Sequence, residues 1–331
     1  RSRGLGDVYK RQIISCMKNM AGMRLAEKRV PQDGHFSLWI DNTEINMRAA
    51  TVPTQIAENI VLRLQDKRLV FVSITTLGFN EEYLRRYQEL IHEPHGIILA
   101  TGPTGSGKTT LLYATLNELN DGQKHIVTIE DPIEFEIAGV NQLQHNPKAG
   151  LGFATALRSI IRQDPDIIMV GEIRDLETAE VAIDAALTGH LVLSTLHTID
   201  AAGAVARLVD LGVDPRRVSP AITAVVAQRL VRKICPHCKK PYTPSRSELQ
   251  MLGNVPNEIM LFRGRGCPDC RKTGYIGRSG IFELLVPNAE IRRLMDSGAS
   301  SNAIRETAVM PFISALTKYM PLLTCSGTIQ L

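Results

Sequence analysis

The sequence predicts an α/β protein whose core is a mainly parallel, doubly wound sheet, and three observations carry this prediction. Residues 102–109 form a complete G-x-x-x-x-G-K-[ST] phosphate loop between an apolar run and a helical pattern. From Gly96 onward, short apolar runs alternate with helical patterns. These runs are apolar almost throughout, which is typical of strands that helices cover on both faces.

Length and composition indicate a globular protein of more than one domain. The 331 residues exceed one typical domain, and a hydrophobic content of 44% is enough for a large core. The net charge of +4, from 38 basic and 34 acidic residues, is too small to indicate nucleic acid or an acidic membrane surface. We find no apolar run long enough to span a bilayer and no signal-peptide pattern, so we expect a cytoplasmic protein.

Both ends of the chain differ from the rest. Residues 1–12 show no helical or strand period, and we expect them to be a non-native tail. Residues 327–331 carry no capping or turn signal, which indicates a truncation or a shifted reading frame at that end.

The N-terminal region predicts a helix followed by a β-hairpin. Residues 13–30 have helical spacing, and residues 31–34 (Pro-Gln-Asp-Gly) indicate a turn. Two strands at about 36–40 and 45–49 flank an Asp41-Asn42 turn, which is a hairpin pattern. An apolar stretch at 60–64, a linker near 74–80 and a charged helix from residue 80 to Leu90 complete this region.

The central region predicts the strands and helices of the doubly wound sheet in order. Strands are expected at 96–101, 125–129, 167–170 and 191–195, and helices at 108–120, 153–163 and 176–187; segments 201–211 and 218–231 continue the alternation. Open sheets of this kind bind ligands at the carboxyl ends of their strands. Residues that directly follow an apolar strand are therefore candidates for the site.

The phosphate loop predicts binding of a nucleoside triphosphate. Its glycines let the backbone curl so that N–H groups face phosphate oxygens, and the helix that follows adds its positive end. Lys108 is expected to reach the β- and γ-phosphates, and Thr109 to offer a hydroxyl to Mg²⁺. The alternative, a chance match in a glycine-rich turn, does not explain the flanking strand and helix. The predicted contacts are Gly102, Pro103, Thr104, Gly105, Ser106, Gly107, Lys108, Thr109 and Thr110.

Carboxylates follow two further strands. Strand 125–129 is followed by Glu130, Asp131 and Glu134, and strand 167–170 by Glu172. Carboxylates at these positions can orient an attacking water or hold Mg²⁺. We expect Glu134 to orient water and Glu172 to serve Mg²⁺, with the reverse assignment open, and Glu130 and Asp131 to contact the nucleotide. A solvated acidic turn is the alternative at 130–134.

Two histidines flank the strand at 191–195. His197 follows the strand, at the same edge as Glu130 and Glu172, so we expect it to sense the γ-phosphate, although a lone histidine is often structural. His190 precedes the strand and belongs at the opposite edge, where a structural and a functional role remain equally open.

Two Cys-x-x-Cys pairs predict a structural zinc site. Four thiolates from such pairs complete a closed tetrahedron, and the intervening segment is rich in proline and glycine. A disulfide or redox role is the alternative, and His237 is a less favoured ligand. The expected ligands are Cys235, Cys238, Cys267 and Cys270, whereas Cys16 and Cys325 show no partner pattern.

Taken in this order, the motifs resemble the secretion-superfamily ATPases, specifically the type II secretion and type IV pilus assembly ATPases of the GspE and PilB kind. The resemblance covers about residues 13–300. It rests on the phosphate loop at 102–110, an acidic box at 128–134, a Walker B segment at 157–175, a histidine box at 188–198 and the tetracysteine pairs.

The resemblance implies a RecA-like P-loop NTPase core that is preceded by a partial PAS-like α+β domain and followed by a zinc-knuckle and a helical C-terminal region. It implies ATP and Mg²⁺ as ligands, a homohexamer peripherally bound to the cytoplasmic face of the inner membrane, and a membrane platform protein as partner. It also implies that arginines of the N-terminal domain or a neighbouring subunit complete the site, and Arg48 is preferred over Arg29 and Arg63. The chain departs from the family at His35, which replaces an arginine, and after Thr307, and it is expected to be N-terminally truncated.

We therefore expect an ATP-hydrolysing motor for assembly of a secretion pseudopilus or a pilus. The expected divisions are 1–12 (tail), 13–75 (partial PAS-like domain), 76–234 (RecA-like domain), 235–283 (zinc subdomain) and 284–331 (helical region). By resemblance, the cysteines favour an extension or secretion motor over a retraction motor. A nucleic-acid motor that grips DNA with zinc knuckles is the rival, but aromatic residues near 235–275 are few, so no nucleic acid is expected. A third option is a nucleotide-dependent scaffold that does not hydrolyse, and the intact set of Lys108, Glu134 and Glu172 argues against it.

Overall fold

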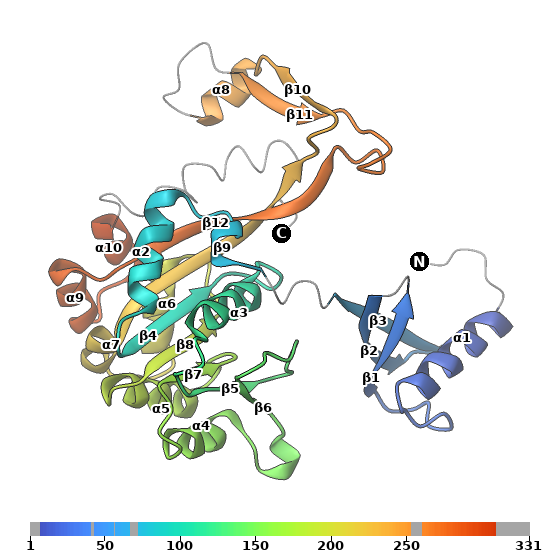
Figure 1. Cartoon of the computed structure of the whole chain (residues 1–331), viewed down its shortest axis with the longest axis horizontal. Coiled ribbons are helices and arrows are strands. Elements are labelled where there is room, and N and C mark those ends of the chain that lie inside the picture. Colours follow the sequence, from blue (N-terminus) through green and yellow to red (C-terminus); the bar gives the residue numbers. More distant parts are fainter. Residues whose placement is uncertain (1–6, 41–42, 56, 67–71, 253–259, 309–331) are drawn as a thin grey trace. The chain divides into compact units, whose positions relative to one another are not determined.

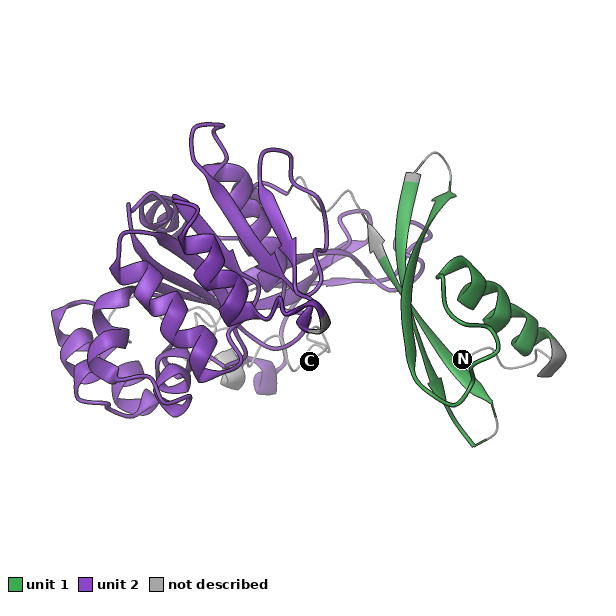
Figure 2. Cartoon of the chain, turned by 90° about the horizontal axis from the view of Figure 1, so that it is seen from below, with its two compact units in different colours: residues 1–70 green, residues 71–331 purple. Residues whose placement is uncertain are grey.

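The computed structural model describes residues 7–40, 43–55, 57–66, 72–252 and 260–308. The chain divides into two compact units, residues 1–70 and 71–331 (Figure 2). No helix among these described residues is both long and apolar enough to cross a membrane.

Unit 1 is a helix on a three-stranded antiparallel sheet. Helix α1 (Asp7–Met20) packs against strands β1 (Gln32–Ile40), β2 (Thr43–Pro53) and β3 (Glu58–Asp66), which pair in that order. Alternate residues of the strands, such as Phe36, Met47 and Ala49, form a small core with the end of the helix. The buried Lys18 ammonium lies 2.7 Å from Glu58 Oε1, so this charge is paired where it is taken out of water.

The predicted hairpin is confirmed, although its turn at 41–42 lies outside the described residues. Two details of the prediction are wrong. Helix α1 begins at Asp7, inside the segment expected to be a tail, and ends at Met20 rather than near residue 30. Residues 32–34, expected in a turn, belong to β1; a Cβ on Gly34 would lie 2.2 Å from Ala21 O, so the glycine serves a close approach to the chain after α1 rather than a turn.

Unit 2 is built on a mainly parallel sheet, as predicted (Figure 1). In the described part of the chain it has seven strands in the order β12-β9-β4-β8-β7-β5-β6. Their bounds are β4 (Gly96–Thr101), β5 (Ile126–Glu130), β6 (Asn141–Gln144), β7 (Ile167–Val170), β8 (Leu191–Leu196), β9 (Ile222–Ile234) and β12 (Tyr275–Leu285). Neighbouring strands run parallel except β12, which is antiparallel to β9.

Helices cover both faces of this sheet, which is why its central strands are buried throughout and mostly apolar. Alternate residues of β4 enter two different cores: Ile97 and Leu99 pack with one, Ile98 and Ala100 with the other. The first core includes α4 (Phe153–Ile161), α5 (Leu176–Leu187), α6 (Ala201–Asp210), α7 (Pro215–Ala221), α9 (Ala289–Asp296) and α10 (Ser301–Ala308). The second includes α2 (Glu81–Ile91) and α3 (Lys108–Leu119).

The segment near 74–80, expected to be a linker, is instead part of the core. Ile74 begins the short 3-10 helix η2 (Ile74–Thr76) and is fully buried. The Gly280 N–H donates to Leu77 O at 2.7 Å, and the Phe79 ring stacks on Phe282 with centroids 3.7 Å apart. The prediction failed because β12, which this segment packs against, was not anticipated.

Strands β9 and β12 lead from the sheet to the cysteine region. The predicted segment 218–231 divides into the end of α7 and the start of β9. After β9 come β10 (Lys239–Tyr242), α8 (Arg246–Leu252) and β11 (Leu261–Gly264), with β10 and β11 paired antiparallel. A second 3-10 helix, η3 (Pro147–Ala149), follows β6.

Candidate nucleotide site and cysteine cluster

A cavity of about 360 Å³ lies where β4, β5, β7 and β8 end. The strand-end rule therefore located it correctly. Its lining comprises Thr104, Gly105, Ser106, Gly107, Lys108, Thr109, Thr110, Leu112, Glu130, Asp131, Pro132, Glu134, Met169, Gly171, Glu172, Thr195, His197, Leu230 and Arg278. Of the predicted nucleotide contacts, Gly102 and Pro103 are outside this lining.

The phosphate loop adopts a conformation that requires glycine at two positions. Gly107 has φ +92° and caps the start of α3, and this is the left-handed region that other residues avoid. A Cβ on Gly102 would lie 2.5 Å from Gln228 O and 2.6 Å from Ser106 Oγ. The loop is thus pressed against β9, and a side chain at either glycine would displace it.

Lys108 is held by the loop that it follows. Its Nζ donates to Gly102 O at 2.9 Å and to Pro103 O at 3.2 Å, and only 8% of the residue is exposed. Burial lowers the pKa of Lys108, while the negative charge of Glu172 opposes this shift. A buried ammonium with neutral carbonyl partners can exchange them for a stronger anionic partner such as phosphate.

Glu130 occupies a supporting position at the base of the cavity. Its carboxylate accepts hydrogen bonds from Tyr113 Oη (2.5 Å), Thr128 Oγ1 (2.7 Å) and Gln142 Nε2 (3.0 Å). Burial raises the pKa of Glu130, and the three donors oppose that rise. Tyr113 Oη also accepts from the Glu134 N–H at 3.2 Å, so Glu130 and Tyr113 together hold the acidic loop. Tyr113 was not among the predicted site residues, because an aromatic residue inside a helical pattern usually indicates the core.

Asp131 and Glu134 line the cavity from the same loop. Asp131 Oδ2 lies 3.3 Å from His145 Nδ1, and the His145 ring stacks on Phe153 with centroids 4.5 Å apart. His145 directly follows β6, a polar edge strand that the sequence analysis did not predict, so this partner was also missed.

Glu172 lies at the centre of the charged groups in the cavity. Its side chain is 15% exposed, and its oxygens lie 2.5 Å from Arg174 and 3.6 Å from His197 Nε2. Burial and the nearby Lys108 lower the pKa of His197, and Glu172 opposes them. The lowered pKa favours the neutral imidazole, which has one nitrogen that accepts and one that donates a hydrogen bond.

His190 lies at the other edge of the sheet, as predicted. Its carbonyl accepts from the Gly96 N–H at 3.1 Å, where β4 and β8 begin. Its Nδ1 lies 3.0 Å from Ala185 O at the end of α5.

Leu230 and Arg278 line the cavity although the sequence analysis did not consider them. They belong to β9 and β12, where the strand-end rule does not apply: Leu230 is inside its strand, and β12 runs antiparallel to its neighbour. Arg278 adds a cation to a cavity that already holds Lys108, which increases its affinity for anions.

The four predicted cysteine ligands form one cluster, with all sulfurs within 4.8 Å of one another. Cys235 and Cys267 Sγ are 3.8 Å apart, and Cys238 and Cys270 Sγ are 3.9 Å apart. Disulfides need about 2.05 Å, whereas a tetrahedral zinc with Zn–S bonds of about 2.3 Å places its sulfurs roughly 3.8 Å apart. His237 is exposed and outside the cluster.

Backbone N–H groups also face the cluster. Cys270 Sγ accepts from the N–H groups of Cys267 (3.1 Å) and Gly274 (3.2 Å), and these bonds lower the pKa of Cys270 to about 6. The Gly266 N–H donates to Cys238 Sγ at 3.3 Å. N–H donors favour the thiolate form of Cys270, which is the form that binds metal, whereas burial and the neighbouring thiols raise the pKa of Cys238 and Cys267.

The candidate arginines of the N-terminal region all lie in unit 1, whereas every residue that lines the cavity lies in unit 2. Arg48 on β2 is in register with His35 on β1 and Arg63 on β3, so the three share one face of the sheet. Arg29 is 89% exposed, with its Nε 3.5 Å from Glu27.

The strand, loop, helix and cavity define unit 2 as a RecA-like P-loop nucleotide-binding core. The chain belongs to the family described as "Type II/IV secretion system protein", whose model matches residues 7–319. This match begins inside the segment that the sequence analysis set aside as a tail.

Relatives at nearly half identity are type II secretion proteins. The chain is 48% identical over 295 residues to the type II secretion system ATPase E of Vibrio cholerae, covering 89% of this chain and 59% of that protein. It is 48% identical over 297 residues to the type II secretion system protein E of Pseudomonas aeruginosa, with the same coverages. The chain thus spans about three fifths of the length of these curated relatives.

Solved structures support the fold. The pilus retraction motor PilT with bound ADP matches with a TM-score of 0.63 at 30% identity, covering 92% of this chain and 76% of PilT. The ATPase DotB of Legionella pneumophila matches with a TM-score of 0.70 at 24% identity, covering 100% and 83%, which is a likeness of fold. The predicted RecA-like core and family are confirmed.

Proposed function

We propose that this chain is part of an ATP-hydrolysing motor that powers assembly of a type II secretion pseudopilus or a type IV pilus. The observation that carries the proposal is the convergence of Lys108, Glu134 and Glu172 on one cavity in a chain of this family. Those three residues supply a phosphate counterion and two carboxylates, which hydrolysis of a triphosphate requires. A nucleotide-dependent scaffold would need only the first.

Each residue of the cavity has a distinct proposed role. Lys108 neutralises the β- and γ-phosphates, and loop N–H groups bind their oxygens. Glu134 orients the attacking water. Neutral His197, 3.6 Å from Glu172, senses the γ-phosphate by a hydrogen bond.

The cavity also fits a magnesium ion. Mg²⁺ prefers oxygen ligands, and the Thr109 hydroxyl and Glu172 carboxylate both line the cavity. Bound there, the ion would neutralise charge that develops on the phosphates. The oxygens of Glu130 already accept three hydrogen bonds, so we assign that residue to support of the acidic loop.

We also propose one structural zinc at Cys235, Cys238, Cys267 and Cys270. The spacing of the sulfurs and the N–H donors around Cys270 support it. All four positions are protein ligands, so the ion would hold the fold together rather than catalyse.

The motor is proposed to be a homohexamer that binds peripherally to the cytoplasmic face of the inner membrane and acts on a membrane platform protein. The names of the relatives support the secretion role. We propose that Arg48 from unit 1 completes the nucleotide site of a neighbouring subunit by stabilising charge on the transferred phosphate.

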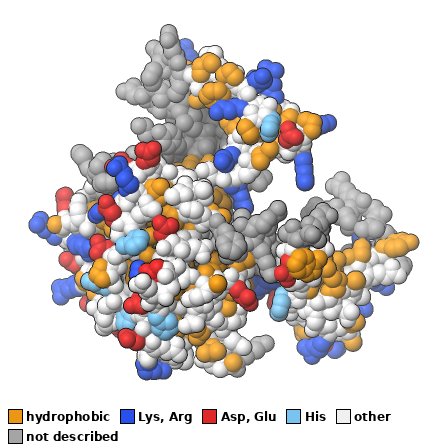
Figure 3. Space-filling view, viewed as in Figure 1, with side chains coloured by type: hydrophobic (Ala, Val, Ile, Leu, Met, Phe, Trp, Pro, Cys, Tyr) orange, Lys and Arg blue, Asp and Glu red, His pale blue; other side chains and the backbone are white. Residues whose placement is uncertain are grey.

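The rival function, a motor that grips nucleic acid, is disfavoured by the aromatic rings near the cysteines. Lys239 Nζ lies 4.1 Å above the Phe262 ring, the Arg263 guanidinium 5.1 Å above Tyr242, and the Arg232 guanidinium 4.1 Å above Tyr275. Each cation covers one face of its ring, which leaves fewer faces on which the bases of a single strand could stack. On the face that Figure 3 shows, basic, apolar and acidic side chains are mixed over the described residues of this part of the chain.

Substitution of Lys108 tests the proposed hydrolysis. Lys108→Ala should lower the rate of ATP hydrolysis by more than about 100-fold, because the phosphates lose their main counterion. The control is Lys124→Ala. Lys124 lies before β5, at the end of that strand away from the cavity, so this variant should hydrolyse ATP at the unmodified rate. Circular dichroism should show both variants folded. Steady-state hydrolysis by Lys108→Ala at the unmodified rate would overturn the site.

Mixing the Lys108→Ala chain with an Arg48→Ala chain extends the same experiment to the shared site. If neighbouring subunits complete each site, mixed assemblies should regain part of the activity that both variants lack. An Arg48→Ala chain with full activity would show that this arginine has no part in hydrolysis.

A further inference from the structure

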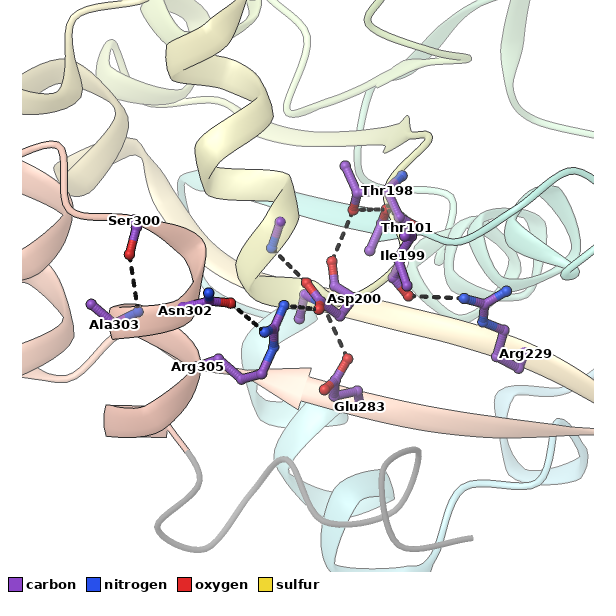
Figure 4. A network of polar contacts seen from close by, with 12 residues as sticks. Thr101, Thr198, Ile199, Asp200, Arg229, Glu283, Ser300, Asn302, Ala303 and Arg305 are labelled. Carbon is purple, nitrogen blue, oxygen red and sulfur yellow. Dashed lines mark hydrogen bonds and ion pairs between the residues drawn. The ribbon is translucent and has the colours of Figure 1, made fainter. Parts of the chain in front are cut away.

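The loop between β8 and α6, residues 197–200, is held by three elements that are distant in the sequence (Figure 4). Asp200 forms an ion pair with Arg305 of α10. The Ala201 N–H donates to Glu283 Oε2 of β12 at 3.1 Å, and Arg229 of β9 donates to Ile199 O at 3.2 Å. The loop begins with His197, so these contacts determine where a cavity residue lies.

The same loop contacts the strand that leads into the phosphate loop. Thr101 Oγ1 accepts from the Thr198 N–H at 3.0 Å, and the two threonine hydroxyls are 2.6 Å apart. Thr101 is the last residue of β4, directly before Gly102, and it is fully buried. A shift of Thr198 would therefore disturb both His197 and the base of the phosphate loop.

Asp200 connects this loop to two helices with separate oxygens. Oδ1 accepts from the Gly203 N–H at 2.7 Å and caps α6, whereas Oδ2 pairs with Arg305. Arg305 is itself oriented by Asn302 Oδ1, which accepts from its Nη1 at 2.7 Å. The Asp200 side chain is 19% exposed and that of Arg305 is 34% exposed, so the pair is partly shielded from water.

The surroundings of this pair are more buried still. Glu283 of β12 is 2% exposed and Arg229 of β9 is 9% exposed, and both side chains contact the chain at residues 199–201. Buried polar groups keep their partners because an unpaired one is costly, so alternative positions of the loop are disfavoured.

We propose that Asp200 and Arg305 are positioning residues for the nucleotide site, with helix α10 as the element that braces the loop carrying His197 and Thr198. This proposal rests on the proposed function, because it assigns a support to the same site. In this proposal, the position of α10 influences the position of the cavity residues through Arg305 and Asp200, although α10 contributes no residue to the cavity lining.

Two substitutions separate positioning from folding. Arg305→Ala removes the brace, and Arg305→Lys keeps a cation that can still reach Asp200. Asp200→Asn removes the charge that pairs with Arg305 but keeps a good cap for α6. The control is Arg217→Ala, because Arg217 of α7 forms an ion pair with Asp184 of α5 that likewise joins two helices and lies outside the cavity lining.

The first measurement is a separation of kcat from nucleotide affinity. We expect Arg305→Ala and Asp200→Asn to lower kcat by about tenfold, because small displacements of reacting groups are expensive, while affinity for a fluorescent ADP analogue stays within about twofold. Arg305→Lys should recover part of kcat, and Arg217→Ala should match the unmodified chain. The double variant should be no worse than either single one, because both remove the same pair. Additive losses, or an unchanged kcat in Arg305→Ala, would overturn the proposal.

A second measurement does not depend on hydrolysis. In Arg305→Ala, the Thr198 amide should exchange its hydrogen at least about tenfold faster and the titration of the His197 ring should shift, whereas Arg217→Ala should change neither. If the unmodified chain hydrolyses no ATP, the proposed function fails, yet these two signals still test the brace. Unchanged exchange and titration would reject it.

Discussion

The candidate nucleotide cavity and the cysteine cluster were both predicted from motifs, but they differ in how far apart their residues lie in the sequence. The cluster draws all its ligands from two short knuckles, and each knuckle is complete in its own stretch of sequence. The cavity draws on the ends of β4, β5, β7 and β8 and on the sides of β9 and β12. When each part of a site lies within a short stretch of sequence, all its residues can be predicted. When a sheet brings the residues together, only those on correctly predicted strands can be found.

The two sites also differ in charge. At the cavity, the Glu172 carboxylate lies near the Lys108 ammonium and forms an ion pair with Arg174, so opposite charges are close together. In the cluster, four like groups are turned toward one another, and backbone N–H groups rather than cations face them. The first arrangement can exchange partners with a ligand, and the second is closed once an ion is bound.

Substitution of the cavity carboxylates is expected to have the largest effect on ATP turnover among the tests of this comparison. Glu134→Gln and Glu172→Gln should each lower turnover by about 100-fold or more, because each removes a charge used in the reaction. Only the variant that loses a magnesium ligand should also need more Mg²⁺ for half-maximal nucleotide binding. Measuring affinity against Mg²⁺ separately from turnover assigns the two roles, with Glu180→Gln on the exposed side of α5 as the control.

Normal turnover in both carboxylate variants would contradict the hydrolytic mechanism. A raised Mg²⁺ requirement in Glu134→Gln alone would exchange the two assignments and leave the site itself intact.

A smaller and more local effect is expected from the cysteines. The purified chain should carry about one zinc, and Cys235→Ser with Cys238→Ser should remove it and lower the melting temperature. Affinity for the ADP analogue should stay within about threefold, because none of the four clustered cysteines lines the cavity. Cys16→Ser, an exposed cysteine outside the cluster, is the matched control. A zinc-free chain whose melting is unaffected by chelators would refute the tetrathiolate site.

The smallest effect concerns stability against pH. Burial, and then the nearby Asp200, raises the pKa of Glu283 to about 7 from 4.5, while Arg305 and Arg229 oppose the shift. The folded chain therefore holds this proton more tightly than the unfolded chain does. The resulting stabilisation is fully present below about pH 4.5 and is lost as the pH rises to about 7.

The glutamine in Glu283→Gln cannot titrate, so the stability of this variant should not show the decrease between pH 4.5 and 7. Between pH 4.5 and 8, the free energy of unfolding of the unmodified chain should fall relative to that of the variant by on the order of 3 kcal/mol. Urea denaturation at several pH values measures the difference. Glu118→Gln, an exposed carboxylate on α3, should run parallel to the unmodified chain. A difference independent of pH would show that Glu283 is ionised throughout.

The fold could be predicted where a segment's own pattern decided its structure. Strands β4, β5, β7 and β8 are apolar because helices cover both faces, and their ends gave Lys108, Glu134, Glu172 and His197. Strand β6 reads Asn-Gln-Leu-Gln and was missed, since an edge strand has little to bury. Strand β12 carries two glycines and two charges, which look like a loop until β9 is beside it.

The missed site residues follow from those missed strands. Arg278 enters the cavity from β12, and His145 reaches Asp131 from the end of β6. No spacing rule connects either residue to the phosphate loop, because the sheet alone brings them together. The helix boundary at Asp7 was missed because a short polar helix end has no distinct period.

The pairing of β9 with β12 closes a long loop, and the entropy cost of closing it depends on the loop's length. Antiparallel neighbours are usually joined by a few residues, but here the chain leaves the ladder after Ile234 and returns at Tyr275. The entropy of closing such an excursion grows only with the logarithm of its length, so a doubling costs about 0.6 kcal/mol. Cross-links between the knuckles at its base would reduce even that cost. The free energy of forming the sheet therefore depends only weakly on the length of this excursion. We expect changes in the length of the segment between the two knuckles to leave the cavity undisturbed.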